Sequence, residues 1–403
     1  MNITFPLILD GAMGTQLYKA GLPRGTCPEQ WILEHPDAAL GIQRAYVSAG
    51  SQVIYAPTFG ANSVMLESHG IFNKVEEYNL RLVELAKTAA DGKALVAGDI
   101  SPLGAMLYPL GDRSFEEIYE IYLEQAAALE KAGVDLYAVE TMTNVAEARA
   151  AVLAIRSVSR KPVFVSFTCD ENGRTMMGTD VCAALLILQG MGVDAFGLNC
   201  STGPDKMLPQ IRRLAKYAAV PLIAKPNAGL PQTVNDSTVY TVDAAEFASY
   251  VPELAEAGVN IFGACCGSDE SFIKAIREKL NGLSMKEPSP EASDRLPCAT
   301  EKNVFLLDSA VSCDSVFACD EELEDNLYEP DDGEVIGIEI TGLMDVAAFA
   351  DVQYAVRNPL CIVCDDAELL EKALRAYQGR ALYDGSLSDE ELLPLVEKYG
   401  LIP

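Results

Sequence analysis

The chain has 403 residues, of which 49% are apolar and 22% are charged, and its formal net charge is −29. This length favours two domains with a sizeable core. The sequence has no run of about 18 uncharged apolar residues, so it predicts no membrane span. The strong negative charge argues against nucleic acid and against an anionic membrane as partners.

The first ten residues lack the basic region with which a signal peptide begins. Without an export signal, the eleven cysteines are expected to be reduced thiols of a cytoplasmic protein. Metal binding or catalysis then explains them better than a disulfide framework does.

Short apolar runs alternate with amphipathic stretches from the N-terminus to about residue 285, which predicts parallel βαβ units. Helices are expected at residues 115–132 and 144–157, among others. Eight strands with intervening helices favour one closed eight-stranded β/α (TIM) barrel over a doubly wound open sheet. The predicted strands are residues 7–10, 52–57, 94–98, 135–140, 162–168, 194–199, 220–225 and 259–264.

Residues 286–300 hold three prolines and few large apolar groups, which predicts a linker after a barrel domain of residues 1–285. Residues 301–403 are expected to form a small acidic α/β C-terminal domain, in which the acidic run 320–334 is a loop. Residues 281–403 carry 27 acidic and 8 basic side chains, which indicates a solvated surface or, alternatively, a docking face for a basic partner. The expected strands are residues 303–307, 335–340, 360–364 and 381–383, and the expected helices are 345–354, 368–377 and 388–399.

Clusters of unusual residues follow six of the eight predicted barrel strands. The C-terminal ends of the strands in a β/α barrel share one face, where active sites are built, so these clusters are expected to converge. Packing alone explains such a distribution poorly. The clusters are residues 10–15, 58–62, 140–142, 199–201, 226–229 and 265–267.

Three cysteines belong to these clusters: Cys200 after the sixth strand, and Cys265 and Cys266 after the eighth. Three thiolates hold one Zn²⁺ and leave its fourth position open for a thiol substrate, as in a catalytic site. The alternative, that they are small buried apolar side chains, is disfavoured because flanking glycines let the two segments approach closely. Cys361 and Cys364 form a lone Cys-x-x-Cys inside an apolar strand, which indicates core packing.

An electron-rich site of three thiolates favours alkyl transfer to a bound thiol. A free thiol of pKa about 8.5 is only slightly ionised at neutral pH, whereas metal binding deprotonates it. Hydrolysis is less natural here, because His35 and His69 are the only imidazoles in the sequence.

Asp10 and Glu140 are the carboxylates predicted beside the metal, where they hold a substrate ammonium. Asp10 alternatively caps the turn that follows it. Glu140 ends an apolar run, where burial without a partner is costly. The glycine-rich segment that begins at Gly11 is expected to offer backbone N–H groups to a substrate carboxylate.

These clusters together resemble the homocysteine S-methyltransferase family, most closely the homocysteine-binding module of cobalamin-dependent methionine synthase, from residue 7 to about residue 280. The resemblance implies a β/α barrel with zinc on Cys200, Cys265 and Cys266, which activates homocysteine for methylation to methionine. It is carried by residues 10–15, 58–62, 140–142, 197–204, 226–231 and 265–267.

The resemblance also implies that Asp10 and Glu140 hold the amino group of homocysteine, and that Asn227 approaches the metal when substrate is absent. The sequence departs from the family pattern at residues 54–58 and 98–102. Neither departure removes a predicted zinc ligand, but both are expected to reshape the pocket on the methyl-donor side.

The sequence points to a methyl donor outside the chain. Neither His35 nor His69 lies in the Asp-x-His-x-x-Gly loop of a cobalamin domain, so cobalamin is expected only in trans, as a methyl-corrinoid on a separate carrier protein. Two alternatives stay open: a small methyl-sulfonium or methyl-ammonium donor, and a non-catalytic subunit that binds zinc and homocysteine. Residues 335–385 faintly resemble part of a folate-binding barrel, but too few strands remain to predict a folate site.

Overall fold

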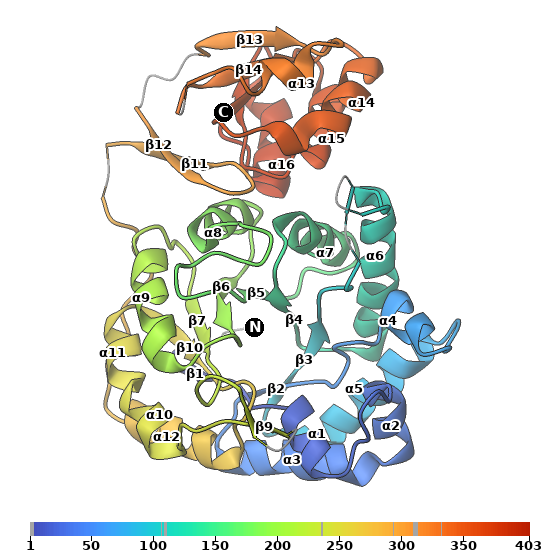
Figure 1. Cartoon of the computed structure of the whole chain (residues 1–403), viewed down its shortest axis with the longest axis vertical. Coiled ribbons are helices and arrows are strands. Elements are labelled where there is room, and N and C mark those ends of the chain that lie inside the picture. The colour runs from blue at the N-terminus through green and yellow to red at the C-terminus, as the bar shows by residue number, and fades with distance from the viewer. Residues whose placement is uncertain are drawn as a thin grey trace.

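The computed structural model describes residues 4–105, 107–108, 111–234, 237–292, 294–308, 313–331 and 333–403. They form a β/α barrel and a smaller C-terminal unit that sits against one side of it (Figure 1). The predicted fold class, an eight-stranded β/α barrel followed by a small α/β unit, is confirmed. None of the helices in these ranges is both long enough and apolar enough to cross a membrane.

Eight parallel strands build the barrel, one at each place where the sequence predicts a strand. They follow the order β1-β10-β7-β6-β5-β4-β3-β2 around the sheet. An antiparallel hairpin, which the sequence pattern does not predict, is inserted after β7 and consists of β8 (Gln232–Val234) and β9 (Ser237–Val239). The barrel strands are β1 (Leu7–Ile8), β2 (Val53–Tyr55), β3 (Leu95–Ile100), β4 (Leu136–Met142), β5 (Val163–Phe167), β6 (Ala195–Asn199), β7 (Leu222–Lys225) and β10 (Val259–Phe262).

The barrel closes between β1 and β2 through a few bonds, one of which uses a side chain of the predicted site. The Gln52 N–H donates to the Ile8 carbonyl at 2.7 Å, and the Gln52 side chain accepts from the Ile8 N–H at 2.9 Å. Further along, the Tyr55 N–H donates to Oδ2 of Asp10 at 2.8 Å. The Asp10 carboxylate therefore satisfies a buried backbone donor of β2 at the closure of the barrel.

Local capping sets the limits of the surrounding helices. The predicted helix at residues 115–132 is α6 (Phe115–Ala132), which begins after Ser114 with a reciprocal pair of bonds between Ser114 and Glu117. It ends at Gly133, whose φ of 71° is accessible to glycine at no steric cost. The other barrel helices are α1 (Gly14–Lys19), α2 (Pro28–Glu34), α3 (Pro36–Ala49), α4 (Ser63–Ser68), α5 (Val75–Ala90), α7 (Val145–Val158), α8 (Val181–Gly190), α9 (Pro204–Ala215), α10 (Ala244–Ser249), α11 (Val251–Glu256) and α12 (Glu270–Leu280).

The interior of the barrel is apolar along most of its length and charged at the C-terminal ends of its strands. Asp99, Glu140 and Lys225 each lie two residues beyond a member of the apolar interior cluster, on β3, β4 and β7. Because side chains alternate along a strand, these three also face the inside of the barrel, at its C-terminal end. The interior cluster comprises Leu7, Leu9, Val53, Tyr55, Ala97, Leu136, Ala138, Phe164, Ala195, Ile223 and Ile261.

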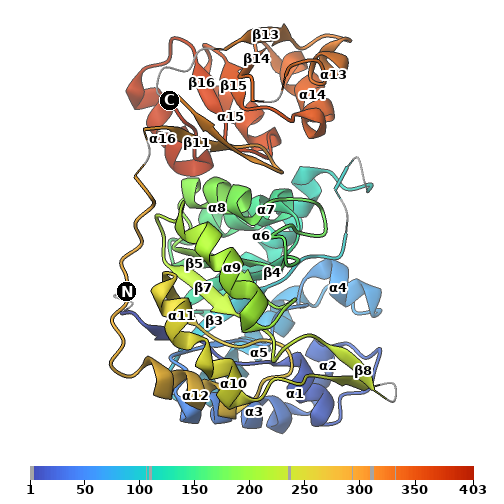
Figure 2. The same ribbon diagram turned by 60° about the vertical axis from the view of Figure 1, so that its left-hand side comes forward.

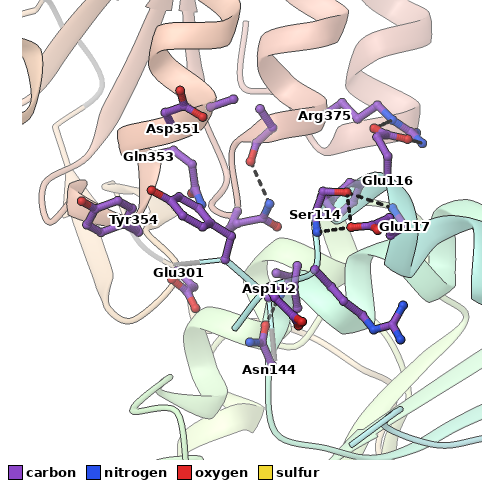
Figure 3. A pocket seen from close by; sticks show the side chains of 18 of the residues that line it. Asp112, Ser114, Glu116, Glu117, Asn144, Glu301, Asp351, Gln353, Tyr354 and Arg375 are labelled. Carbon is purple, nitrogen blue, oxygen red and sulfur yellow. Dashed lines mark hydrogen bonds and ion pairs between the residues drawn. The ribbon is translucent and has the colours of Figure 1, made fainter. Parts of the chain in front are cut away.

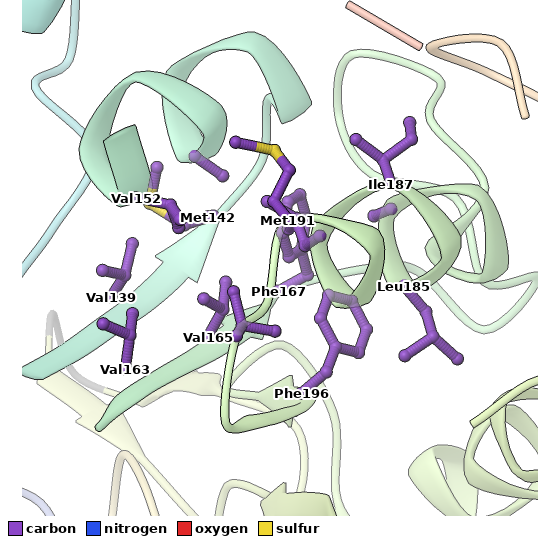
Figure 4. Close-up of a cluster of buried hydrophobic side chains, with 14 of the residues drawn as sticks. Val139, Met142, Val152, Val163, Val165, Phe167, Leu185, Ile187, Met191 and Phe196 are labelled. Atoms are coloured by element: carbon purple, nitrogen blue, oxygen red, sulfur yellow. The ribbon is translucent and has the colours of Figure 1, made fainter. Parts of the chain in front are cut away.

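Helices α7 and α8 are buried on every face. Residues 145–155 of α7 and 181–188 of α8 are buried without interruption. On one side they pack against β4, β5 and β6 (Figure 4). The C-terminal unit covers the other side, so one continuous apolar cluster spans both parts of the chain. Burial on all faces is the condition under which an all-apolar helix such as α8 is stable.

The C-terminal unit contains a parallel sheet in the order β13-β14-β15-β16 and a separate β11-β12 hairpin. Its predicted strands and helices are present. In addition, β11 begins inside the stretch predicted as a linker, and α13 lies in the acidic run predicted as a loop. Leu323 and Leu327 are buried at α13, and this burial stabilises one helical turn that the acidic sequence alone does not favour. The elements are β11 (Leu296–Ala299), β12 (Val304–Leu307), β13 (Ser315–Ala318), α13 (Leu323–Asn326), β14 (Ile336–Glu339), α14 (Leu343–Val352), the 3-10 helix η1 (Gln353–Ala355), β15 (Leu360–Val363), α15 (Ala367–Ala376), β16 (Leu382–Asp384) and α16 (Asp389–Tyr399).

The two parts of the chain are in intimate contact. Arg149 of α7 is 1% exposed, and its guanidinium donates to Oε1 of Gln378 and to the Leu374 carbonyl, both at 2.8 Å. The backbones of Gly190 and Gly400 lie so close that a Cβ on Gly190 would be 3.1 Å from Cα of Gly400. The segment between the two parts runs along the outside of the barrel (Figure 2).

Candidate metal centre

Cys200, Cys265 and Cys266 converge at the C-terminal end of the barrel, as predicted. Their sulfur atoms all lie within 4.8 Å of one another, and in the described ranges no other three His, Cys, Asp or Glu side chains meet this spacing. The Sγ atoms of Cys200 and Cys266 are 3.8 Å apart. A Zn–S bond of about 2.3 Å in a tetrahedral site separates two sulfurs by about 3.8 Å, so the spacing fits zinc.

The backbone that carries the cysteines is held in an unusual conformation. Cys200 and Ser201 have φ angles of 60° and 55°, in the left-handed region that residues other than glycine seldom adopt. The Cys200 N–H donates to the Lys225 carbonyl at 3.1 Å, and the Cys265 N–H donates to the Pro226 carbonyl at 2.8 Å. The end of β7 therefore fixes both cysteine loops, and the strain at Cys200 is of the kind that accompanies functional sites.

Three thiols at this spacing disfavour one another's ionisation. A hydrogen bond with Cys200 raises the pKa of Cys265, and burial adds to the increase. For Cys200, the bond with Cys265 lowers the pKa, but the bond with Cys266 and burial bring it to about 11. For Cys266, the bond with Cys200 lowers the pKa, but the bond with Cys265 and burial bring it to about 12. A divalent cation offsets this repulsion, because it binds the thiolate form.

Tyr240 is an additional neighbour of the cysteines that the sequence did not indicate. Burial, the charge of Cys266 and a hydrogen bond with Cys266 raise the pKa of the Tyr240 hydroxyl. Gly267, at φ 86°, gives the ring room, since a Cβ there would be 2.3 Å from the Tyr240 side chain. The phenol therefore closes one side of the thiol set.

Asn199, the last residue of β6, links the cysteine loop to β4 and β5. Its Oδ1 accepts from the Thr141 N–H and from the Ser166 hydroxyl, both at 2.9 Å, and its Nδ2 donates to Oγ1 of Thr141 at 2.7 Å. Thr141 itself has a positive φ of 63°. Glu140 and Cys200 each adjoin one end of this linkage, so their spacing is fixed by it.

Asp10 and Glu140, the two predicted substrate-binding carboxylates, lie close together with a lysine between them. Nζ of Lys225 is 3.2 Å from Oδ1 of Asp10, 3.3 Å from Oε2 of Glu140 and 3.8 Å from the centroid of the Tyr55 ring. Gly263 makes space for this side chain, because a Cβ there would be 2.6 Å from Cγ of Lys225. Sequence reasoning missed Lys225, although a charge at the end of an apolar strand is the same signal that marked Glu140.

A fourth charged residue, Asp99, completes this buried group. Burial raises the pKa of Asp99 well above its usual value, and the negative charge of Glu140 adds to the effect. Burial also raises the pKa values of Asp10 and Glu140, although the positive charge of Lys225 opposes it. Burial lowers the Lys225 pKa, but the charges of Glu140 and Asp10 outweigh it and raise the value. The two carboxylates therefore favour the protonated form of Lys225.

The remaining predicted residues lie beside this group. Gly11 packs under Tyr46, and a Cβ there would be 2.7 Å from the ring. The next N–H, that of Ala12, donates to Oγ of Ser268 at 3.0 Å, so it is already engaged. Asn227 is 2% exposed, and its Oδ1 has no hydrogen-bond partner among the described residues. A buried amide oxygen of this kind is a potential ligand atom.

A separate hollow of about 690 Å³ lies at the junction of the barrel and the C-terminal unit (Figure 3). It is lined by the loop before α6 and by α6, α14 and α15, and it contains acidic and basic side chains in similar numbers. Arg375 and Glu116 bridge it with two bonds of 2.5 and 2.7 Å. None of the predicted site residues lines this hollow.

The fold and the site define a β/α-barrel protein with a three-cysteine centre at the active-site face, beside a buried cluster of carboxyl and ammonium groups. The chain belongs to the homocysteine S-methyltransferase family, because the family model described as "Homocysteine S-methyltransferase" matches residues 7–280. The resemblance noted from the sequence is thereby confirmed.

Known relatives agree with this family. The chain is 33% identical over 288 residues to the methionine synthase of Mycobacterium leprae, covering 67% of this chain and 24% of the relative. It is 32% identical over 305 residues to the methionine synthase of Mycobacterium tuberculosis, covering 71% and 25%. The chain thus spans about a quarter of the length of these relatives. The metallated form of the homocysteine methyltransferase MmuM from Escherichia coli superposes with a TM-score of 0.59 at 25% identity, covering 68% of this chain and 96% of that one.

Proposed function

We propose that this chain is a zinc-dependent methyltransferase that moves a methyl group onto the thiol of homocysteine to form methionine. The observation that carries the proposal is the set of three cysteine sulfurs within 4.8 Å of one another. Its geometry suits a metal with three protein ligands and one open position. Zinc bound there supplies a Lewis acid that keeps the substrate sulfur deprotonated at neutral pH.

Residues of the chain hold the metal and the rest of the substrate. Cys200, Cys265 and Cys266 bind the metal, and the Asn199 linkage keeps Cys200 at a fixed distance from Glu140. The negative charge of Glu140 and Asp10 favours a substrate with an α-ammonium group over a simple thiol. Asn227 offers its amide oxygen to the same region. Burial of these groups excludes water, which strengthens each of the charge interactions.

The methyl donor is proposed to be a methyl-corrinoid on a separate protein, so that cobalamin acts in trans. Support comes from the similarity to two methionine synthases over 67% and 71% of the chain. We propose a cytoplasmic location, in keeping with eleven free cysteines. We also propose a barrel domain of residues 1–285, a linker of 286–300 and a C-terminal domain of 301–403, whose acidic surface suits a basic patch on the donor protein.

A methyl-transfer assay tests the proposal. Zinc-loaded protein is incubated with homocysteine and, in turn, with free methylcobalamin, a protein-bound methyl-corrinoid, a methyl-sulfonium compound and a methyl-ammonium compound, and methionine is quantified. Methionine formation with the protein-bound corrinoid supports the full proposal. Formation only with a small donor overturns the donor assignment, and no methionine with any donor overturns the enzyme assignment.

A further inference from the structure

The C-terminal unit carries two cysteines that contact each other and belong to no site described above. Cys361 lies on β15 and is 4% exposed, whereas Cys313, which precedes β13, is partly exposed. Both belong to an apolar cluster formed by the β11-β12 hairpin and the parallel sheet, with Cys361 as a buried member and Cys313 packed against it. In the sequence Cys361 forms a Cys-x-x-Cys with Cys364, but in the structure its hydrogen-bonding partner is Cys313.

A glycine on the strand between the two cysteines lets their side chains approach. Gly337 of β14 pairs with Cys361 in the parallel register, so side chains at these two positions project from the same face of the sheet. Sγ of Cys313 lies over that face, because a Cβ on Gly337 would be 3.1 Å from it. The Asp314 N–H donates to the Val335 carbonyl at 2.8 Å, which holds the segment before β13 against β14. The missing side chain at residue 337 therefore leaves room for Cys313 to reach across β14 toward Cys361.

The other cysteines of the C-terminal unit are held differently. Sγ of Cys319 donates to the Glu339 carbonyl at 3.5 Å, and Sγ of Cys364 donates to the Asp366 carbonyl at 3.3 Å. Cys298 is fully buried in the same apolar cluster, and burial raises its pKa to about 12. Donation to a carbonyl and burial both favour the protonated thiol, which is the unreactive form.

From this geometry we infer that Cys313 and Cys361 are a modification site, which hydrogen peroxide oxidises to a reversible disulfide across β14. Cys313 meets the oxidant, because it is the more exposed of the two, and Cys361 is the resolving thiol. The hydrogen bond that Cys361 donates lowers the pKa of Cys313, and the same bond together with burial raises the pKa of Cys361. A partly exposed thiol with a lowered pKa beside a resolving cysteine is the arrangement of redox-sensitive sites.

The oxidation consumes one hydrogen peroxide per pair and proceeds in two steps. The Cys313 thiolate attacks one peroxide oxygen, the O–O bond breaks, and the products are a sulfenic acid and hydroxide, which the proton lost by Cys313 converts to water. The Cys361 thiol then attacks the Cys313 sulfur, so that the S–S bond forms and the S–O bond breaks. The oxygen leaves as a second water with the Cys361 proton. The two thiols lose two electrons, and the peroxide gains them.

Peroxide treatment of the zinc-loaded full-length chain tests the inference. The protein is exposed to hydrogen peroxide, its remaining thiols are blocked with N-ethylmaleimide, and its peptides are mapped by mass spectrometry without reduction. A disulfide between Cys313 and Cys361 should be the first to form outside the three metal-binding cysteines, and dithiothreitol should reverse it. In Cys361→Ser the sulfenic acid of Cys313 should persist and react with dimedone, whereas the wild type should be labelled far less.

Two further variants separate this geometry from general thiol reactivity. Gly337→Ala places a methyl group 3.1 Å from the present position of the Cys313 sulfur. It should displace that sulfur and slow disulfide formation about ten-fold, because the two sulfurs then meet only after backbone movement. Cys319→Ser, in the same unit, is the matched control and should form the disulfide at the wild-type rate.

Several results would overturn the inference. Absence of a disulfide between Cys313 and Cys361 after peroxide treatment, or a disulfide between Cys361 and Cys364 in its place, would show that the pair only packs in the core. Equal dimedone labelling of Cys313 in the wild type and in Cys361→Ser would mean that Cys361 is not the resolving thiol. Peptide mapping detects the disulfide without reference to methyl transfer, so the modification site stands or fails independently of the proposed function.

Discussion

The mouth of the barrel and its junction with the C-terminal unit both gather charged side chains, but they use them differently. At the mouth, Lys225 lies between two carboxylates and its side chain is 4% exposed. At the junction, Arg375 and Glu116 pair with exposures of 23% and 59%, and the buried Arg149 bonds to neutral groups. Buried charges of both signs suit the recognition of a charged substrate, whereas neutral partners and exposed pairs suit adhesion between two parts of one chain.

The largest effect is expected from removal of the C-terminal unit. A chain that ends at residue 285 exposes the apolar faces of α7 and α8, which the unit covers in the intact protein. Exposed apolar surface of this kind favours aggregation, so we expect the truncated barrel to be insoluble or oligomeric in size-exclusion chromatography. A monomeric truncated barrel with the melting temperature of the whole chain would show that the junction contributes little to stability.

Loss of a cysteine ligand should abolish metal binding and leave the fold in place. Cys266→Ser is expected to reduce zinc from about one ion per chain to less than about 0.1 after washing with a weak chelator, because only two thiolates remain. Mass spectrometry of the metal content and circular dichroism measure the two effects. Cys319→Ser, in the C-terminal unit, is the control and should retain zinc. Retention of zinc by Cys266→Ser would place the metal elsewhere.

The buried arginine at the junction should matter for stability and little for the site. Arg149→Met removes donors to Gln378 and to the Leu374 carbonyl, which leaves buried acceptors unpaired and is expected to cost about 2–4 kcal/mol. Urea unfolding measures this loss. Arg212→Met, which breaks an ion pair with exposures of 58% and 55%, should cost less than about 1 kcal/mol. Equal losses in the two variants would contradict the account of the junction.

A small effect is expected from the cap of α6, at the edge of the junction hollow. Ser114→Ala removes the hydroxyl that accepts from the Glu117 N–H, and the expected loss is about 1 kcal/mol. Ser114→Asp retains an acceptor and should be close to wild type in the same unfolding measurement. If both variants unfold as the wild type does, the capping box does not stabilise α6.

Much of this arrangement follows from the sequence, since strand periodicity located all eight barrel strands and the ends of β6 and β10 located the cysteines. Lys225 was not identified, because its partners lie more than 80 residues away in the chain and only closure of the barrel brings them together. The packing of the C-terminal unit against α7 and α8 was not predicted either, although the uninterrupted apolar run of α8 indicates a helix buried on all sides. Short elements such as α13 depend on burial of one or two leucines, which local propensity does not reveal.

X-ray absorption at the zinc edge tests the central claim most directly. Zinc-loaded protein should show three sulfur ligands at about 2.3 Å, and addition of homocysteine should raise the number to four as the substrate thiol takes the open position. Fewer than three sulfurs in the free protein, or a number that homocysteine does not change, would contradict the account.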